Sequence, residues 1–273
     1  MINVFGGTGF IGSAYVEKYP NCMINERNDH TVKTKDILYF ISTVDNYNVF
    51  NDLHVDIDTN LTTLMNVLAT IEDKERTVFN FISSWFVYGD TQLPAREDSP
   101  CNPKGFYSIT KHAAEQLLIS YCETFGMKYR ILRLGNVVGS TDPNASKKKN
   151  AIVHLIKELK QNNNIKLYTG GHIYRDIIDI DDCVDAINLI LTKGEYNTIY
   201  NVGNGHPVLL QRFITHAKKI LHSSSMIGEM DTPEFHKVVQ VRSMYMDNSK
   251  LKSLGYIQKY DLTQIIWRVV NGT

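Results

Sequence analysis

A cluster of glycines directly follows the first short apolar run, in the opening stretch MINVFGGTGFIG. Glycine loses more conformational entropy on folding than any other residue, so such a cluster indicates that something approaches this backbone closely. Residues 2–5 are typical of a buried strand and residues 10–16 of the start of a helix, which places the glycines at a strand-to-helix turn. We expect this turn to be formed by Gly6, Gly7, Thr8, Gly9, Phe10, Ile11 and Gly12.

The turn matches a phosphate-binding pattern. Gly7, Gly9 and Gly12 fit G-x-G-x-x-G, which permits a tight turn, a close approach of a pyrophosphate, and packing of the helix on the strand. Amide N–H groups at the start of the helix then face the anion. We therefore predict dinucleotide binding at this turn; the alternative is a glycine-rich turn without a ligand.

Two charged residues follow the next expected strand, NCMIN. Glu26 and Arg27 lie where a dinucleotide fold meets the adenosine ribose. A carboxylate accepts hydrogen bonds from the ribose hydroxyls of NAD, whereas an arginine pairs with the extra phosphate of NADP. The position of Glu26 at the strand end favours NAD, with NADP as the open alternative. A third possibility is that both residues are solvated charges in a loop.

The connection after Arg27 is unusually short. Only NDHTVKT separates this residue from the next apolar run, DILYFIST. A further strand with its crossover helix needs a dozen or more residues. We therefore predict that one strand–helix unit is missing at this point.

Strand-like and helix-like stretches alternate through the rest of the chain, in the order DILYFIST, NLTTLMNVLATI, TVFNFISS, SITKHAAEQLLISYCETF, YRILRLGNVVG, RDIIDIDDCVDAINLIL and TIYNVGNG. This alternation predicts an α/β fold, a Rossmann-like doubly wound parallel sheet with right-handed crossovers. The polar stretch TDPNASKKKN is the clearest break. We expect a NAD(P)-binding domain at residues 1–140 and 176–204, and a small C-terminal substrate-binding lobe at residues 141–175 and 205–273.

Composition narrows the classes of partner. Lys plus Arg and Asp plus Glu each number 29, so the formal net charge is zero and no overall field attracts nucleic acid or an anionic membrane. The sequence contains neither a leader pattern nor a run of about 18 apolar residues. We expect a cytoplasmic protein without nucleic-acid or membrane partners. Its four cysteines and nine histidines follow no metal-ligand or disulfide spacing, so we also expect no metal.

The stretch YSITK carries the most informative pair. Residues four apart share one face of a helix, so Lys111 is expected beside Tyr107. A free tyrosine has a pKa of ~10, and a nearby cation favours its phenolate. Tyr107 is then able to exchange a proton with a substrate oxygen while Lys111 holds the cofactor ribose. Ser84 ends the preceding strand at the sheet edge where such folds bind ligands. Taken singly, the residues are explained better by structural roles: Tyr107 and Lys111 as an exposed pair four residues apart on a helix, and Ser84 as an ordinary turn or cap residue.

Seven pieces of the sequence, taken in order, carry a resemblance: GGTGFIG, SSWFVYG, YSITK, LRLGNVVG, RDIIDIDD, YNVGNG and DNSKLKSLGY. Over nearly its whole length the chain resembles extended short-chain dehydrogenases/reductases of the nucleotide-sugar epimerase/dehydratase family. The resemblance implies a catalytic set of Ser84, Tyr107 and Lys111. Ser42, Thr43 and Asn60 complete the cofactor-binding set. Family members commonly pair through the helix that carries Tyr107 and its neighbour at about residues 59–71, which implies a homodimer.

The substrate-binding set implied by the resemblance comprises Ser84, Trp85, Phe86, Asn136, Asn150, Arg175 and Arg242. Within it, Asn136 and Arg175 would contact the nucleotide diphosphate, which suits the forked guanidinium of arginine. The alternative for Arg175 is a structural ion pair with Asp176 or Asp179. Trp85 and Phe86 would line the sugar pocket; the alternative is that they belong to the hydrophobic core.

Three functions follow from the resemblance. The leading hypothesis is an NAD-dependent nucleotide-sugar 4-epimerase that acts through a transient 4-keto sugar. The alternative is an NADPH-dependent nucleotide 4-keto-sugar reductase of deoxysugar synthesis, and a third is a catalytically silent dinucleotide-binding protein. Trp85 and Phe86 stand where 4,6-dehydratases carry an Asp-Glu pair, and aromatic rings transfer no protons, which disfavours dehydration.

Overall fold

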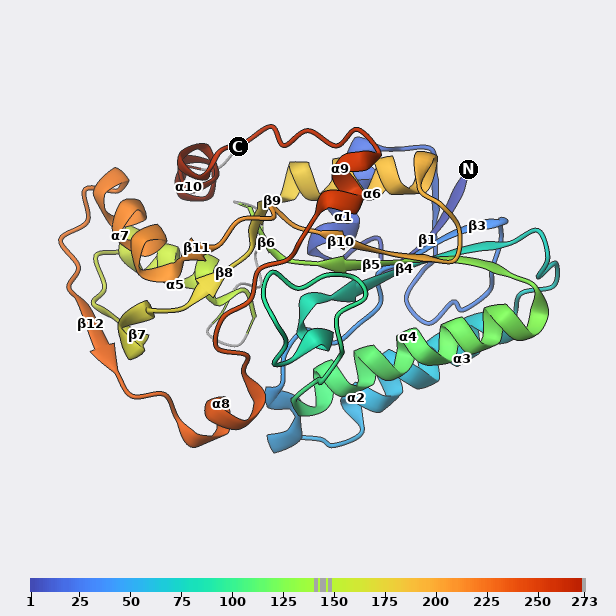
Figure 1. Cartoon of the computed structure of the whole chain (residues 1–273), viewed down its shortest axis with the longest axis horizontal. Helices are drawn as coiled ribbons and strands as arrows, with labels where there is room; N and C mark the ends of the chain where they lie inside the picture. Colours follow the sequence, from blue (N-terminus) through green and yellow to red (C-terminus); the bar gives the residue numbers. More distant parts are fainter. Residues whose placement is uncertain (140–141, 143–145, 147–148, 272–273) are drawn as a thin grey trace.

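A parallel sheet forms the centre of the molecule in the computed structural model, which describes residues 1–139, 142, 146 and 149–271 (Figure 1). Within these residues the sheet has six strands in the order β10-β5-β4-β3-β1-β2. Their bounds are β1 Ile2–Phe5, β2 Cys22–Ile24, β3 Asp36–Tyr39, β4 Val78–Ser84, β5 Lys128–Leu134 and β10 Thr198–Val202. The predicted α/β fold with a parallel sheet is confirmed.

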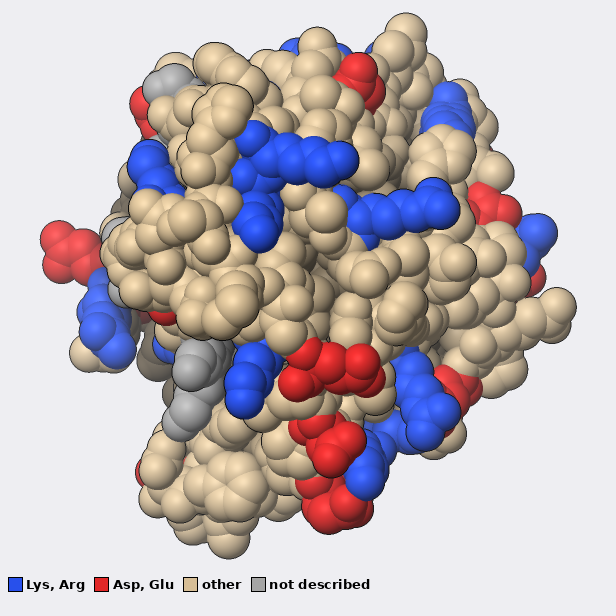
Figure 2. Space-filling view, turned by 90° about the vertical axis from the view of Figure 1, so that its left-hand side faces the viewer, with Lys and Arg blue, Asp and Glu red and all other residues tan. Residues whose placement is uncertain are grey.

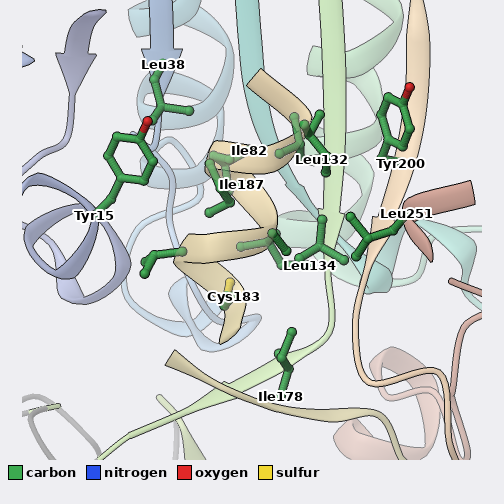
Figure 3. Close-up of a cluster of buried hydrophobic side chains, with 14 of the residues drawn as sticks. Tyr15, Leu38, Ile82, Leu132, Leu134, Ile178, Cys183, Ile187, Tyr200 and Leu251 are labelled. Carbon is green, nitrogen blue, oxygen red and sulfur yellow. The ribbon is translucent and has the colours of Figure 1, made fainter. Parts of the chain in front are cut away.

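Helices cover both faces of this sheet, with α1 and α6 on one side and α3 and α4 on the other (Figure 1). They span α1 Phe10–Lys18, α3 Thr63–Ala69, α4 Gly105–Phe125 and α6 Ile180–Lys193. Alternate strand residues point to opposite faces, so Leu38 and Ile82 pack under α6 (Figure 3) while Ile37 and Phe81 belong to the cluster that includes residues of α3 and α4. Burial on both faces explains why these strands read as continuous apolar runs.

The sheet lacks the unit that the short connection predicted to be missing. Strand β2 lies at the edge beside β1, and β3 pairs with β1 on its other side. Residues 25–35 pass between them without a helix or strand. The buried Asn25 holds this link, because its amide donates to the carbonyls of Asp29 at 3.0 Å and Thr31 at 2.8 Å.

A second lobe packs beside the carboxyl edge of the sheet. Its core joins α5, α7 and α10 with the strand pair β7 and β12, through residues such as Ile156, Leu167, Phe213 and Ile266. The bounds are α5 Ala151–Lys160, β7 Ile165–Tyr168, α7 Leu210–Ile220, β12 Ile227–Met230, α8 Glu234–Val239 and α10 Leu262–Asn271. The predicted division at residues 140 and 141 lies outside the described part of the chain.

Shorter elements connect the two lobes. Two-stranded pairs form between β6 Asn136–Val138 and β9 Ile177–Asp179, and between β8 Tyr174–Arg175 and β11 Val208–Leu209. The remaining helical segments are η1 Tyr47–Phe50, α2 Val55–Ile57, η2 Asp58–Thr62, η3 Trp85–Tyr88, η4 Thr169–Gly171 and α9 Ser249–Ser253.

Both signs of charge occupy the face of the second lobe that Figure 2 presents, with acidic side chains gathered in its lower half. Across the described residues, no helix has the length and apolar character needed to cross a membrane. In the same residues, no group of three or more His, Cys, Asp or Glu side chains is arranged to hold a metal ion.

Candidate active site

A cleft of about 1760 Å³ opens between the carboxyl edge of the sheet and the second lobe. Strand ends and the glycine turn form one wall, and residues of α5, β7 and α8 form the opposite one. Its lining includes the sequence-predicted residues Gly6, Gly9, Phe10, Ile11, Gly12, Ser42, Thr43, Trp85, Phe86, Tyr107, Lys111, Asn136, Asn150, Arg175 and Arg242. The structure therefore brings most of the predicted residues to a single cavity.

The glycine turn leaves space for a ligand. Gly6 has a φ of +77°, and a Cβ on Gly12 would lie only 2.3 Å from the carbonyl oxygen of Gly6, so both positions require glycine. At Gly9, which precedes the first residue of α1, the nearest atom to an added Cβ is 3.5 Å away. The start of α1 therefore faces the cleft with little cover, as a pyrophosphate requires. The residues present fit a dinucleotide.

Tyr107 lines the cleft, and Ser84, which is not among the described lining residues, is hydrogen-bonded to it. Ser84 is the last residue of β4, and Tyr107 lies in the first turn of α4. Burial raises the pKa of Tyr107 to about 12; a hydrogen bond with Ser84 lowers this pKa, whereas the nearby carboxylates of Asp56 and Asp45 raise it. The phenol is therefore neutral near pH 7 and is hydrogen-bonded to the side chain of Ser84.

Lys111 lies one turn further along α4, almost fully buried. Its Nζ donates to the carbonyl oxygen of Ile82 at 2.6 Å and lies 4.1 Å from the ring centroid of Phe81. Burial lowers the pKa of Lys111 to about 7, although the charge of Glu115 raises it. The expectation that Lys111 lowers the pKa of Tyr107 is wrong for this structure, because burial dominates both groups.

The segment after β3 forms the wall beside Tyr107. Asn60 holds it: the Asn60 Oδ1 accepts from the backbone N–H of Thr43 at 2.9 Å and from Ser42 Oγ at 3.1 Å. The Asn60 amide also donates to Thr110 of α4 at 2.9 Å. Asn60 is itself buried, so it positions Ser42 and Thr43 from behind the cleft surface.

Glu26 and Arg27 are exposed beyond the end of β2, outside the described lining of the cleft. Thr8 is also exposed in the glycine turn, whereas Gly7 is buried beneath it. A Cβ on Gly7 would lie 3.0 Å from a methyl carbon of Ile24. Gly7 therefore serves the packing of the turn on the sheet.

Arg175 reaches the cleft from β8. Its guanidinium donates to the backbone carbonyls of Arg242 at 2.6 Å and Val241 at 3.2 Å, and it lies 5.4 Å from the ring centroid of Trp85. Burial lowers the pKa of Arg175 to about 10. The guanidinium is thus anchored by neutral carbonyls, and its charge is left for an anion.

The alternative of a structural ion pair for Arg175 is wrong. Asp179 pairs with Arg268 at 2.9 Å. Asp176 accepts hydrogen bonds from the backbone N–H groups of Asn204 at 2.6 Å and Met246 at 3.1 Å. Burial raises the pKa of Asp176 to about 6, while these backbone hydrogen bonds lower it.

Two asparagines line the cleft near Arg175. Asn136 Nδ2 donates to the backbone carbonyl of Asp176 at 3.0 Å. Asn150 precedes α5 with a φ of +51°, and its amide donates to the carbonyl of Val137 at 3.2 Å and to Asp142 at 3.1 Å. Their amides are therefore oriented by the lobe that faces the sheet.

The aromatic pair after Ser84 divides between core and cleft. Trp85 is buried at 3 % exposure and packs with Tyr88 and Met244. Phe86 stacks on Trp85 with ring centroids 4.0 Å apart and meets Tyr107 edge-on at 5.7 Å. Trp85 is thus mainly a core residue that also borders the cleft, and Phe86 orients the phenol of Tyr107.

Two features of the site escaped sequence reasoning. Asp45 follows β3 and lines the cleft beside Tyr107. Its place just after an apolar run, at the carboxyl edge of the sheet, was the available signal. The hydroxyl of Tyr47 also contacts Nε2 of His236 from α8. No local pattern predicts this contact, because the two residues are 189 positions apart.

Comparisons with known proteins agree with this geometry. A model of the NAD dependent epimerase/dehydratase family matches residues 26–203. A relative from Methanocaldococcus jannaschii, whose name assigns it provisionally to the UDP-glucose 4-epimerases, is 28% identical over 307 residues and covers 99% of this chain and 97% of its own.

Solved structures share the fold. The UDP-glucose 4-epimerase of Thermotoga maritima with UDP-glucose has a TM-score of 0.86 at 20% identity, covering 98% of this chain and 97% of that one. The UDP-glucuronic acid 4-epimerase of Bacillus cereus, in complex with UDP-glucuronic acid and NAD, has a TM-score of 0.85 at 18% identity, covering 99% and 98%.

Proposed function

The chain belongs to the NAD dependent epimerase/dehydratase family, and we propose that it is a nucleotide-sugar 4-epimerase that uses NAD. The observation that carries this proposal is that Tyr107 and Lys111 line one cleft together with the glycine turn and Arg175, while Ser84 is hydrogen-bonded to Tyr107. The full-length relationship to a protein assigned to the UDP-glucose 4-epimerases supports a UDP-sugar as substrate.

Different residues of the cleft bind the cofactor and the substrate in this proposal. The start of α1 and the glycine turn bind the pyrophosphate of NAD, and Lys111 binds its nicotinamide ribose. Bound NAD supplies reversible two-electron oxidation of a sugar carbon. Arg175 and Asn136 bind the diphosphate of the substrate, which orients the sugar ring toward Tyr107.

Tyr107 moves the proton in this proposal. Its phenolate oxygen takes the proton from the sugar hydroxyl, and the phenol so formed returns a proton to the same oxygen, while Ser84 donates a hydrogen bond there. Because burial holds the pKa of Tyr107 at about 12, the phenolate needs a cation close by. In this proposal Lys111 becomes that cation only when NAD is bound, because hydrogen bonds to the ribose hydroxyls would raise the pKa of Lys111 against the effect of burial.

One observation favours a second candidate, an NADPH-dependent nucleotide 4-keto-sugar reductase. Arg27 is exposed just beyond β2 beside Glu26, where an extra ribose phosphate would be paired. The two candidates differ in stoichiometry: an epimerase returns its NAD unchanged, whereas a reductase consumes one NADPH for each keto sugar.

We also propose that the protein forms a homodimer through α4 and its neighbours. The apolar side chains of Phe106, Ile109 and Leu117 are exposed at helical spacing along α4, and Ile57 of α2 is exposed nearby. A contiguous apolar face of this kind is typical of an interface. The cytoplasmic location stays a prediction from the sequence.

The test is the interconversion of UDP-glucose and UDP-galactose with NAD, compared between the wild type and Tyr107→Phe. We expect kcat to fall by about 10²–10⁴-fold in the variant while NAD still binds, because only the proton-transferring hydroxyl is removed. Tyr121→Phe, on the same helix but bonded to the carbonyl of Leu68, is the matched control. Unchanged turnover in Tyr107→Phe would overturn the assignment.

A further inference from the structure

Asp45 places a carboxylate beside the reacting position of the cleft. We propose that Asp45 determines sugar specificity: it accepts a hydrogen bond from a hydroxyl of an uncharged sugar ring and rejects a ring that carries its own carboxylate. This inference rests on the proposed function, since it concerns the substrate of the same cleft. It adds a selecting residue on the sheet side, opposite the cationic side where the diphosphate is bound.

The carboxylate of Asp45 is held in a fixed direction. Its Oδ1 accepts from the backbone N–H of Tyr47 at 2.8 Å, which closes a tight local turn. The residue is only 9% exposed, and it lines the cleft together with Tyr107. Asp45 is therefore a mostly buried residue that still borders the cleft.

The backbone around Asp45 is fixed against the helix that carries Tyr107. A Cβ on Gly105 would lie 2.5 Å from Asn46 Oδ1, so the segment touches the first residue of α4 directly. Asn60 bridges Thr43 to Thr110 of the same helix. The residues on both sides of Asp45 therefore contact α4 directly or through Asn60, and these contacts fix the position of Asp45 relative to Tyr107.

Charge makes this position selective. In the described part of the chain Asp45 forms no ion pair, and Asp56, its buried neighbour, accepts from Thr43 and Asn48 instead of a cation. The field of both carboxylates reaches Tyr107, whose pKa they raise. A sugar hydroxyl supplies the donor that Asp45 lacks, whereas a ring carboxylate meets a like charge in a poorly solvated site.

Binding measurements separate this inference from the proposed function. Calorimetric titrations with UDP, UDP-glucose and UDP-glucuronic acid would be run on the NAD-loaded protein. We expect the wild type to prefer UDP-glucose over UDP-glucuronic acid by about tenfold or more, the size of a screened repulsion between two charges. Asp45→Asn keeps the oxygen that accepts from Tyr47, and we expect it to reduce that preference to about twofold or less.

Each outcome decides one of the two statements. If UDP itself does not bind, the proposed function fails and the inference fails with it. If UDP and UDP-glucose bind but Asp45→Asn leaves the preference over UDP-glucuronic acid unchanged, the inference alone is overturned. A wild type that binds both sugars equally also overturns it.

Two further variants guard the interpretation. Asp231→Asn removes one negative charge from the exposed rim of the same cleft, so it controls for the overall field and should keep the wild-type preference. Asp45→Ser also retains an acceptor for the turn. Should Asp45→Asn fold poorly, as judged by its melting temperature, Asp45→Ser carries the same expectation and the same power to refute.

Discussion

Burial shifts the pKa of both Tyr107 and Lys111, and the shift at Lys111 makes the free energy of unfolding depend on pH. The pKa of Lys111 falls from 10.5 to about 7 on folding. Between these two values the unfolded chain binds more protons than the folded one, so this residue makes stability rise with pH. Keeping the amine charged in the folded state lowers the free energy of unfolding by about 1.4 kcal/mol for each unit by which its pKa is lowered.

Lys111→Met tests this linkage. We expect the free energy of unfolding of the variant to exceed that of the wild type most at pH 6. The difference should shrink as the pH rises from 7 toward 10.5, because the folded amine is then neutral and no longer carries the cost of a buried charge. Urea denaturation at several pH values measures it. Parallel pH curves for the two proteins would contradict the buried, weakly basic amine.

At the level of single residues, a chemical role can be predicted from the sequence when the residue's position follows from its own strand or helix. Ser84 at a strand end and the pair Tyr107 and Lys111 on one helix needed no distant information. The structure places Tyr107 and Lys111 in the lining of the cleft and Ser84 in hydrogen-bond contact with Tyr107. Their environment was not predictable, because burial by residues far away in the chain decides the pKa of each group. From the sequence, nothing distinguished Asp45 from other polar residues that follow a strand.

At the level of elements, the glycine turn joins strand and helix through two different steric requirements. Gly12 admits no Cβ, since this atom would lie 2.3 Å from the carbonyl oxygen of Gly6, whereas Gly9 has room on the protein side. The same pattern therefore serves the fold at one position and the ligand at another.

A pair of alanine substitutions separates these roles. Gly12→Ala should lower the free energy of unfolding by about 1–3 kcal/mol through overpacking. Gly9→Ala should leave stability nearly unchanged but weaken NAD binding by roughly tenfold or more, because its methyl group occupies the approach of the pyrophosphate. Thermal melts and NAD titrations measure both effects; equal loss of stability in the two variants would refute the division.

Most helices and strands could be predicted from the spacing of apolar residues and from the breaks between apolar runs. The strands of the sheet, the long helix α4 and the missing unit after β2 were all predicted, because each depends on local apolar patterns or on the length of a connection. The small strand pairs β6 with β9 and β8 with β11 were not, since each joins short segments through partners distant in sequence. Pairing of this kind is set by tertiary contacts rather than by propensity.

At the level of the whole molecule, an aromatic contact closes the cleft between the two lobes. Phe235 of α8 lies edge-on to Phe50 with centroids 4.6 Å apart, and Tyr47 and His236 meet beside them. The sheet-side segment and the second lobe are thereby tied across the mouth of the cavity. If the lobes close around a nucleotide sugar, this contact would order the closed form.

Phe235→Ala tests the closure. We expect KM for UDP-glucose to rise by about three- to tenfold while kcat changes little, because the variant loses ordering of the closed cleft and keeps the reacting residues. Val238→Ala, which truncates an exposed apolar side chain on the same helix, serves as control. A fall in kcat without a change in KM would show that α8 acts on chemistry instead.

The proposed dimer belongs to the same scale, because its interface would use the helix that carries Tyr107 and Lys111. Leu117→Glu puts a charge on the exposed apolar face of α4, and we expect it to shift the protein to monomer in light scattering coupled to size exclusion. Ile257→Glu introduces the same charge at an exposed apolar site after α9 and should leave the dimer intact. A wild type that is monomeric at high concentration would refute the interface, and a Leu117→Glu monomer with lowered kcat would indicate that dimerisation holds α4 in register with the cleft.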